Sequence, residues 1–136
     1  MTDSAVIALI LARADAFAGA PRRGENDHFD ANGRPFFEIA FPGAGKRRGA
    51  IGDASNPLWS EDGAFMCHAY VPLGAGREHA DAICDGLSDL FLEWATPPAG
   101  LTIFERFPGS EGPRDVSGER WWGRSFGIRY RYQSTG

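Results

Sequence analysis

Two glycine-containing segments carry residue types that could bind phosphate or a metal ion. Gly43-Ala44-Gly45-Lys46 contains the Gly-Lys pair of a phosphate-binding loop, but Arg47 takes the place of the magnesium-binding hydroxyl and Ala40 that of the first glycine. His28–Gly33 resembles half of a calcium loop, yet its twelfth position is Ile39 instead of a bidentate glutamate. We therefore expect a turn with a basic tip in the first segment and a hairpin turn in the second.

The remaining residues that could do chemistry do not form a pattern. His28, His68 and His79 stand at no metal-ligand spacing from one another or from a cysteine. Cys84 lies on the apolar face of an expected helix, where a thiolate is disfavoured, and no serine lies in an elbow context. The sequence thus predicts no catalytic, metal or cofactor site, and a protein that is not an enzyme.

Composition excludes several other classes. The net charge is 14 − 18 = −4 without a lysine or arginine block, so we expect no sequence-specific nucleic-acid binding. The apolar run Ala5–Ala12 lacks a preceding positive charge and is too short to span a bilayer, which predicts neither secretion nor a membrane segment. Cys67 and Cys84 are expected to be reduced, buried thiols in a cytosolic protein.

Periodicity predicts a single α+β domain over residues 1–136. The expected sheet is mostly antiparallel or mixed, with one long amphipathic helix packed on a face and a second helix at the N-terminus. The helices are expected at about 3–18 and 77–95, the strands at 36–41, 63–71, 101–107 and 122–132. The segments 43–56 and 108–118 are expected to be loops, the first with a short strand near 48–51.

The long helix has an acidic side opposite its apolar one. Its members are Glu78, Asp81, Asp85, Asp89 and Glu93. Either they keep a solvated face soluble, or they form a lining that repels nucleic acid inside a ring, because no phosphate is neutralised there. In the last strand, Arg129 and Arg131 either keep a solvent face soluble or pair with a neighbouring subunit.

One known family has a similar pattern. The run from Tyr70 to Phe91 resembles the strand, Gly-x-Gly turn and Leu-Phe-ending helix of bacteriophage tail terminator proteins and related head–tail joining or tail completion proteins. An early strand ending in Phe41-Pro42-Gly43, an irregular segment to Trp59 and a closing Trp-x-x-x-Phe-x-Ile-x-Tyr-x-Tyr strand at Trp122–Tyr132 fit the same layout.

This resemblance implies a structural virion assembly protein of a phage, prophage or phage-like particle. Such a protein forms a homo-oligomeric ring, typically a hexamer, that caps the tail tube and joins it to the head connector, with DNA passing through. It would reside in the host cytoplasm during assembly and then in the virion tail. Bulky aromatic and arginine side chains are candidates for the assembly interface: Arg47, Arg48, Trp59, Arg114, Trp121, Trp122, Arg129 and Arg131.

Two alternatives stay open at this point. One is a small ligand-binding domain or enzyme that uses the cleft between sheet and long helix, with His68, Tyr70 and Glu38 as its polar groups. The other is an adaptor domain, similar to an antitoxin, that binds another cellular protein.

Overall fold

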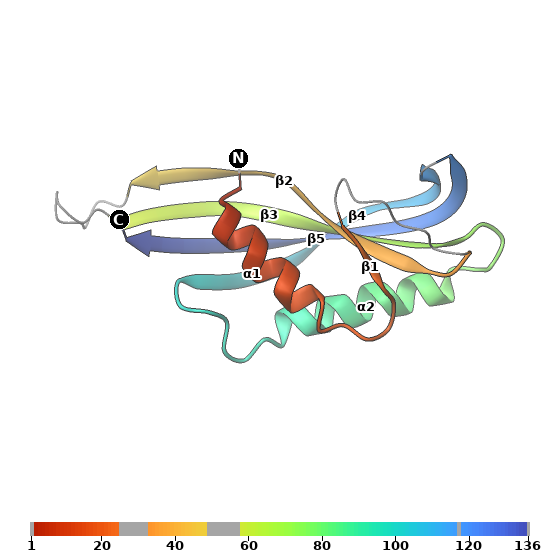
Figure 1. Ribbon diagram of the computed structural model, residues 1–136, viewed down its shortest axis with the longest axis horizontal. Coiled ribbons are helices and arrows are strands. Elements are labelled where there is room, and N and C mark those ends of the chain that lie inside the picture. The colour runs from red at the N-terminus through yellow and green to blue at the C-terminus, as the bar shows by residue number, and fades with distance from the viewer. Residues whose placement is uncertain (1, 25–32, 49–57, 117, 136) are drawn as a thin grey trace.

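The computed structural model describes residues 2–24, 33–48, 58–116 and 118–135, which form an α+β fold (Figure 1). Five strands form one mixed sheet in the order β1-β2-β3-β5-β4; β1 runs parallel to β2 and every other neighbouring pair is antiparallel. The elements in chain order are α1 (Ser4–Ala14), β1 (Arg22–Arg23), β2 (Phe36–Arg48), β3 (Leu58–Pro72), α2 (Glu78–Leu92), β4 (Leu101–Val116) and β5 (Glu119–Thr135).

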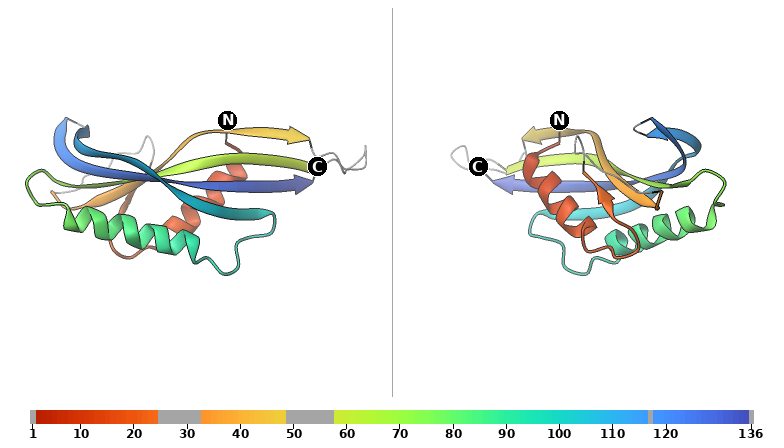
Figure 2. Two further views of the ribbon diagram at one scale, coloured as in Figure 1. Left: turned by 180° about the vertical axis from the view of Figure 1, so that it is seen from behind. Right: turned by 45° about the vertical axis from the view of Figure 1, so that its right-hand side comes forward.

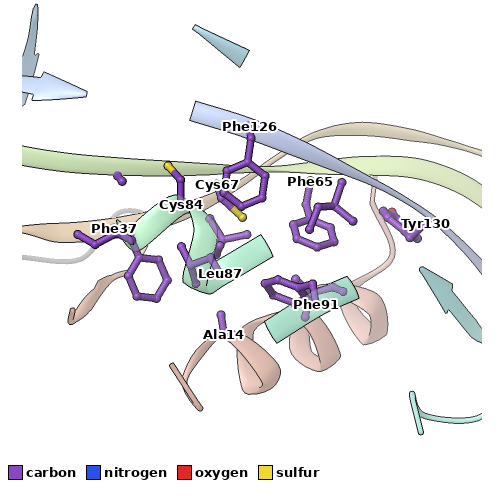
Figure 3. Close-up of a cluster of buried hydrophobic side chains, with 14 of the residues drawn as sticks. Ala14, Phe37, Phe65, Cys67, Cys84, Leu87, Phe91, Phe126 and Tyr130 are labelled. Carbon is purple, nitrogen blue, oxygen red and sulfur yellow. The ribbon is translucent and has the colours of Figure 1, made fainter. Parts of the chain in front are cut away.

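Both helices cover the same face of the sheet and leave the other face open (Figures 1 and 2). The apolar side of α2 is buried at Ile83, Leu87 and Phe91, as the helical periodicity predicts. Figure 3 shows Leu87 and Phe91 facing the core side of β3 and β5, and the Phe91 ring packs on Phe65 at 4.8 Å between centroids. Among the described residues, neither helix is long and apolar enough to cross a membrane.

The helices are shorter than predicted. The Asp3 side chain accepts a hydrogen bond from the Ala5 N–H and caps α1, which ends at Ala14 because the chain turns there and places Phe17 edge-on against Phe37. The helix α2 ends at Leu92, three residues before the predicted end, with a turn in which the Trp94 N–H donates to the Phe91 carbonyl.

The strands are longer than predicted, because pairing with neighbouring strands overrides local turn signals. β2 continues through Pro42-Gly43 by a bulge between Ala40 and Gly43, so that the predicted strand end is wrong. β4 likewise continues from Leu101 to Val116 with two bulges, and the predicted loop 108–118 is largely a long β-hairpin with β5. The predicted strand near 48–51 coincides with β2 only at Arg48, and its other residues lie outside the described part.

Prolines lie in β4, the outer strand at one edge of the sheet, and in β2, which the short strand β1 covers at only two residues at the other edge. Pro42 lies in β2, which pairs with β1 only at Phe37 and Glu38, and Pro108 and Pro113 lie in β4, the last strand at the opposite edge. Proline cannot donate a backbone hydrogen bond to a further strand, and bulges twist an edge away from pairing. These edges are therefore poorly suited to joining the sheet of another molecule.

A buried carboxylate attaches the N-terminal segment to the sheet. Glu61 of β3 is 1% exposed; it accepts a hydrogen bond from the Tyr130 hydroxyl at 2.8 Å and one from the Asp3 N–H at 3.0 Å. Burial and the adjacent Glu61 raise the pKa of Tyr130, so that the phenol remains a donor. Glu61 thereby sets where α1 begins.

Replacing Glu61 should destabilise the fold. In Glu61→Ala the Tyr130 hydroxyl and the Asp3 N–H lose their buried acceptor, so we expect the free energy of unfolding to fall by roughly 3 kcal/mol in urea denaturation. Glu119→Ala, at an exposed site, is the matched control and should change it by less than about 0.5 kcal/mol. Equal effects of the two substitutions would contradict this role of Glu61.

Candidate functional site

The open face of the sheet carries a connected group of polar side chains. Glu38, His68 and Ser125 are cross-strand neighbours on β2, β3 and β5 and form one row, because each strand turns alternate residues to this face. Tyr70 donates from its hydroxyl to Glu38 Oε1 at 2.8 Å. Arg114 reaches the row from β4. These five residues are called the polar row below.

Hydrogen bonds connect the centre of the polar row. Arg114 Nη1 donates to Ser125 Oγ at 2.8 Å, and Ser125 Oγ and His68 Nδ1 are hydrogen-bonded at 2.6 Å. Burial lowers the pKa of His68 below its usual value; Arg114 lowers it further and Glu38 opposes both. The lowered pKa favours the neutral imidazole.

The polar row connects neighbouring strands of the sheet. Ser125 is 5% exposed, and it lies at the wall of a hollow of about 480 Å³ that β4 and β5 form. The second guanidinium nitrogen of Arg114, Nη2, donates to Ser110 Oγ at 2.6 Å and to the Ser110 carbonyl at 3.0 Å. Arg114 therefore ties the β4–β5 hairpin, which curls away from the helix side of the sheet (Figure 2), to β3 and β5.

His68, Tyr70 and Glu38, the polar groups predicted for a sheet–helix cleft, do lie together, but on the opposite face from α2. Alternation along β3 turns Cys67 and Ala69 to the helices and His68 and Tyr70 away from them. The prediction of their location is wrong, because the apolar half of each strand fills the sheet–helix interface.

Tyr70 also belongs to an aromatic cluster on the open face. Its ring stacks on Phe36 at 5.0 Å, and the Trp121 ring meets Phe36 edge-on at 5.1 Å. Burial, followed by the hydrogen bond to Glu38, raises the pKa of Tyr70 to about 12. Trp121, a candidate interface residue, is 4% exposed and packs within its own chain.

An exposed aromatic patch lies elsewhere on this face, and sequence reasoning missed it. Phe104 of β4 is 52% exposed, and the guanidinium of Arg131 lies 5.7 Å from its ring. Arg131 pairs with Asp62 at 2.7 Å and Arg129 with Glu105 at 3.1 Å. A hollow of about 350 Å³ adjoins Phe104. The adjacency of Ile103 and Phe104 was the available signal, since two successive strand side chains cannot face the same side without a bulge.

The acidic side of α2 divides into two groups. Asp81 contacts Arg124 at 2.7 Å and Arg77 at 3.2 Å, and Asp85 contacts Arg106 at 3.4 Å, so these two carboxylates hold α2 against the sheet and its own first turn. Glu78, Asp89 and Glu93 are exposed and make no ion pair with the described residues. Only the second group can present free negative charge to a partner.

Two other candidate interface residues, Trp59 and Trp122, lie on the side of the sheet that carries the helices. The Lys46 ammonium lies 5.8 Å from the centre of the Trp59 ring near α1, and the Arg77 guanidinium lies 5.7 Å from the centre of the Trp122 ring near the start of α2. Arg47 and Arg48 belong to β2, but their side chains lie outside the described part, as does the segment 49–57 of the predicted loop.

In the described ranges, no group of three or more histidine, cysteine, aspartate or glutamate side chains could hold a metal ion. Neither a protein-family model nor a curated protein matches this chain.

The polar row predicts a pH dependence of stability. Because folding lowers the pKa of His68, the unfolded chain binds more protons below the usual value of 6.5, and stability should fall as the pH decreases through that value. Urea denaturation at pH 7.5 and 5.0 should show that the free energy of unfolding falls less between these pH values in His68→Gln than in the native chain. His79→Gln, which changes an exposed histidine of α2, is the control, and its free energy of unfolding should fall by as much as that of the native chain. An equally large fall in His68→Gln would contradict the role of His68 in this pH dependence.

Proposed function

We propose that this chain is a structural assembly subunit of a phage or phage-like particle, a tail terminator that forms a ring at the head-proximal end of the tail tube. Its partners are further copies of itself, expected as a hexamer, together with the tail tube protein and the head–tail connector. The resemblance implies an N-terminal helix, an early strand, a strand that leads into the long helix, and a closing strand, and α1, β2, β3, α2 and β5 follow one another in this order. This agreement supports the proposal.

The observation that carries the proposal is the two-sided sheet. Both helices pack on one face, and the opposite face exposes the Phe104 side chain beside a hollow and two arginines. An exposed aromatic residue with arginines around it is typical of the centre of a protein interface. Because both sheet edges carry prolines and bulges, neighbours would meet through faces rather than by extending the sheet.

The β4–β5 hairpin supplies the surface for the other partners. Arg114 fixes it to the polar row, and Glu111 on its β4 strand pairs with Arg77 at the start of α2 at 2.9 Å. A rigid projecting hairpin suits docking on a preformed tube or connector, because little conformational entropy is lost on binding. DNA would pass the ring without sequence-specific contact.

The test uses the tail tube protein encoded in the same genome. Gold-labelled chain mixed with assembled tubes should label one tube end only in electron micrographs, and the labelled tubes should stop growing when more tube protein is added. Label along the whole tube length, or on no tube, would overturn the proposal. Labelled chain unfolded by heat and cooled on the grid is the control for unspecific attachment.

A further inference from the structure

We propose that neighbouring copies meet front to back: the last turn of α2 on one copy docks on the Phe104 patch of the next. The contact rests on the proposed ring and names the surfaces that build it. Phe104 with Arg129 and Arg131 is called the sheet patch, and Leu92 with Asp89 and Glu93 the helix patch.

The sheet patch is built by a bulge. Between Ile103 and Arg106 two residues of β4 stand opposite Arg129 of β5, and Phe104 is left on the open face instead of in the core. Bulges that redirect a side chain are common beside functional sites. The ion pairs of Arg129 and Arg131 join exposed groups, so exchanging their partners for those of another molecule costs little.

The helix patch has the complementary composition. Leu92 is 44% exposed at the end of α2 and offers an apolar side chain to the hollow beside Phe104. Asp89 lies one turn before Leu92 on the helix and beside Glu93, and in the described part of the chain no cation pairs with either carboxylate. These two carboxylates can pair with Arg129 and Arg131 in exchange for Glu105 and Asp62, the exposed groups that pair with the arginines within the chain.

The placement of the patches determines the type of assembly. The sheet patch lies on the open face of the sheet, and the helix patch lies on the side that the helices cover. Each contact between two copies therefore joins two different surfaces of the chain. Contacts between two different surfaces repeat head to tail and close into a ring when the rotation permits. Asp89 and Glu93 would then lie between subunits, and Glu78 remains available for the expected acidic lining of the channel.

Charge reversal provides the first test, in sedimentation of the full chain. The sheet variant Arg129→Glu/Arg131→Glu and the helix variant Asp89→Lys/Glu93→Lys should each fail to form the native oligomer. An equimolar mixture of the two variants should restore the native oligomer. When the variants alternate around the ring, each contact joins either two native patches or two patches with reversed charge. Arg120→Glu, an exposed arginine of the hairpin, should assemble like the native chain.

The apolar contact provides the second test. Leu92→Ser and Phe104→Ser should each weaken association on the order of tenfold, since both side chains would lie at the centre of the contact. Leu73→Ser changes a leucine that is 51% exposed but lies outside both patches, and it should leave association unchanged. All three sites are exposed, so thermal unfolding should confirm that each variant is folded.

The outcomes separate this contact from the proposed function. A helix variant that assembles alone, a mixture that stays dissociated, or a native chain that stays monomeric at all concentrations would overturn the contact. If the native chain still labels tube ends in those cases, the terminator proposal stands without it. If the native chain assembles through the two patches but never labels tubes, the contact stands and the terminator proposal falls.

Discussion

The packing of α2 across the sheet determines which surfaces of this chain a partner can reach. Phe91 on Phe65 and the neighbouring apolar contacts bury the middle of one face of β3 and β5. Arg124 and Arg106 then hold the flank of the helix through Asp81 and Asp85. The sheet is left with one face that the helices do not cover, and the alternation of apolar and polar residues along the strands follows from that asymmetry.

The free face is not a uniform polar surface. At one place it is closed by aromatic packing around Phe36 and by the polar row, which orders the hairpin. At another it exposes Phe104 beside paired charges. The same face thus serves internal order in one part, and in the other it offers the aromatic side chain on which the proposed contact is built.

The sequence predicts the α+β fold and the buried face of α2 well, because 3.6-residue and two-residue periods report burial directly. It also pairs Phe126, Ile128 and Tyr130 correctly on the core side of β5. It fails where distant pairing decides the outcome: Pro42 and Pro108 read as strand ends, but edge strands tolerate a missing donor. Which face His68 and Tyr70 occupy depends on the side to which the helices pack, and local sequence does not contain that information.

The connection between the helix patch and the sheet patch would set the angle between them within one subunit, and therefore the geometry of the proposed front-to-back contact. Residues 93–100 join the helix patch to the start of β4, and the Gln133 N–H donates to the Gly100 carbonyl at 2.9 Å. Gly100 has φ +89°, and a side chain there would collide with the Gln133 carbonyl oxygen, so the connection fits only glycine. The end of α2 is thereby fixed relative to β4 and β5. A fixed angle between two unlike patches sets the rotation from one copy to the next, and that rotation determines whether a ring closes and with how many subunits.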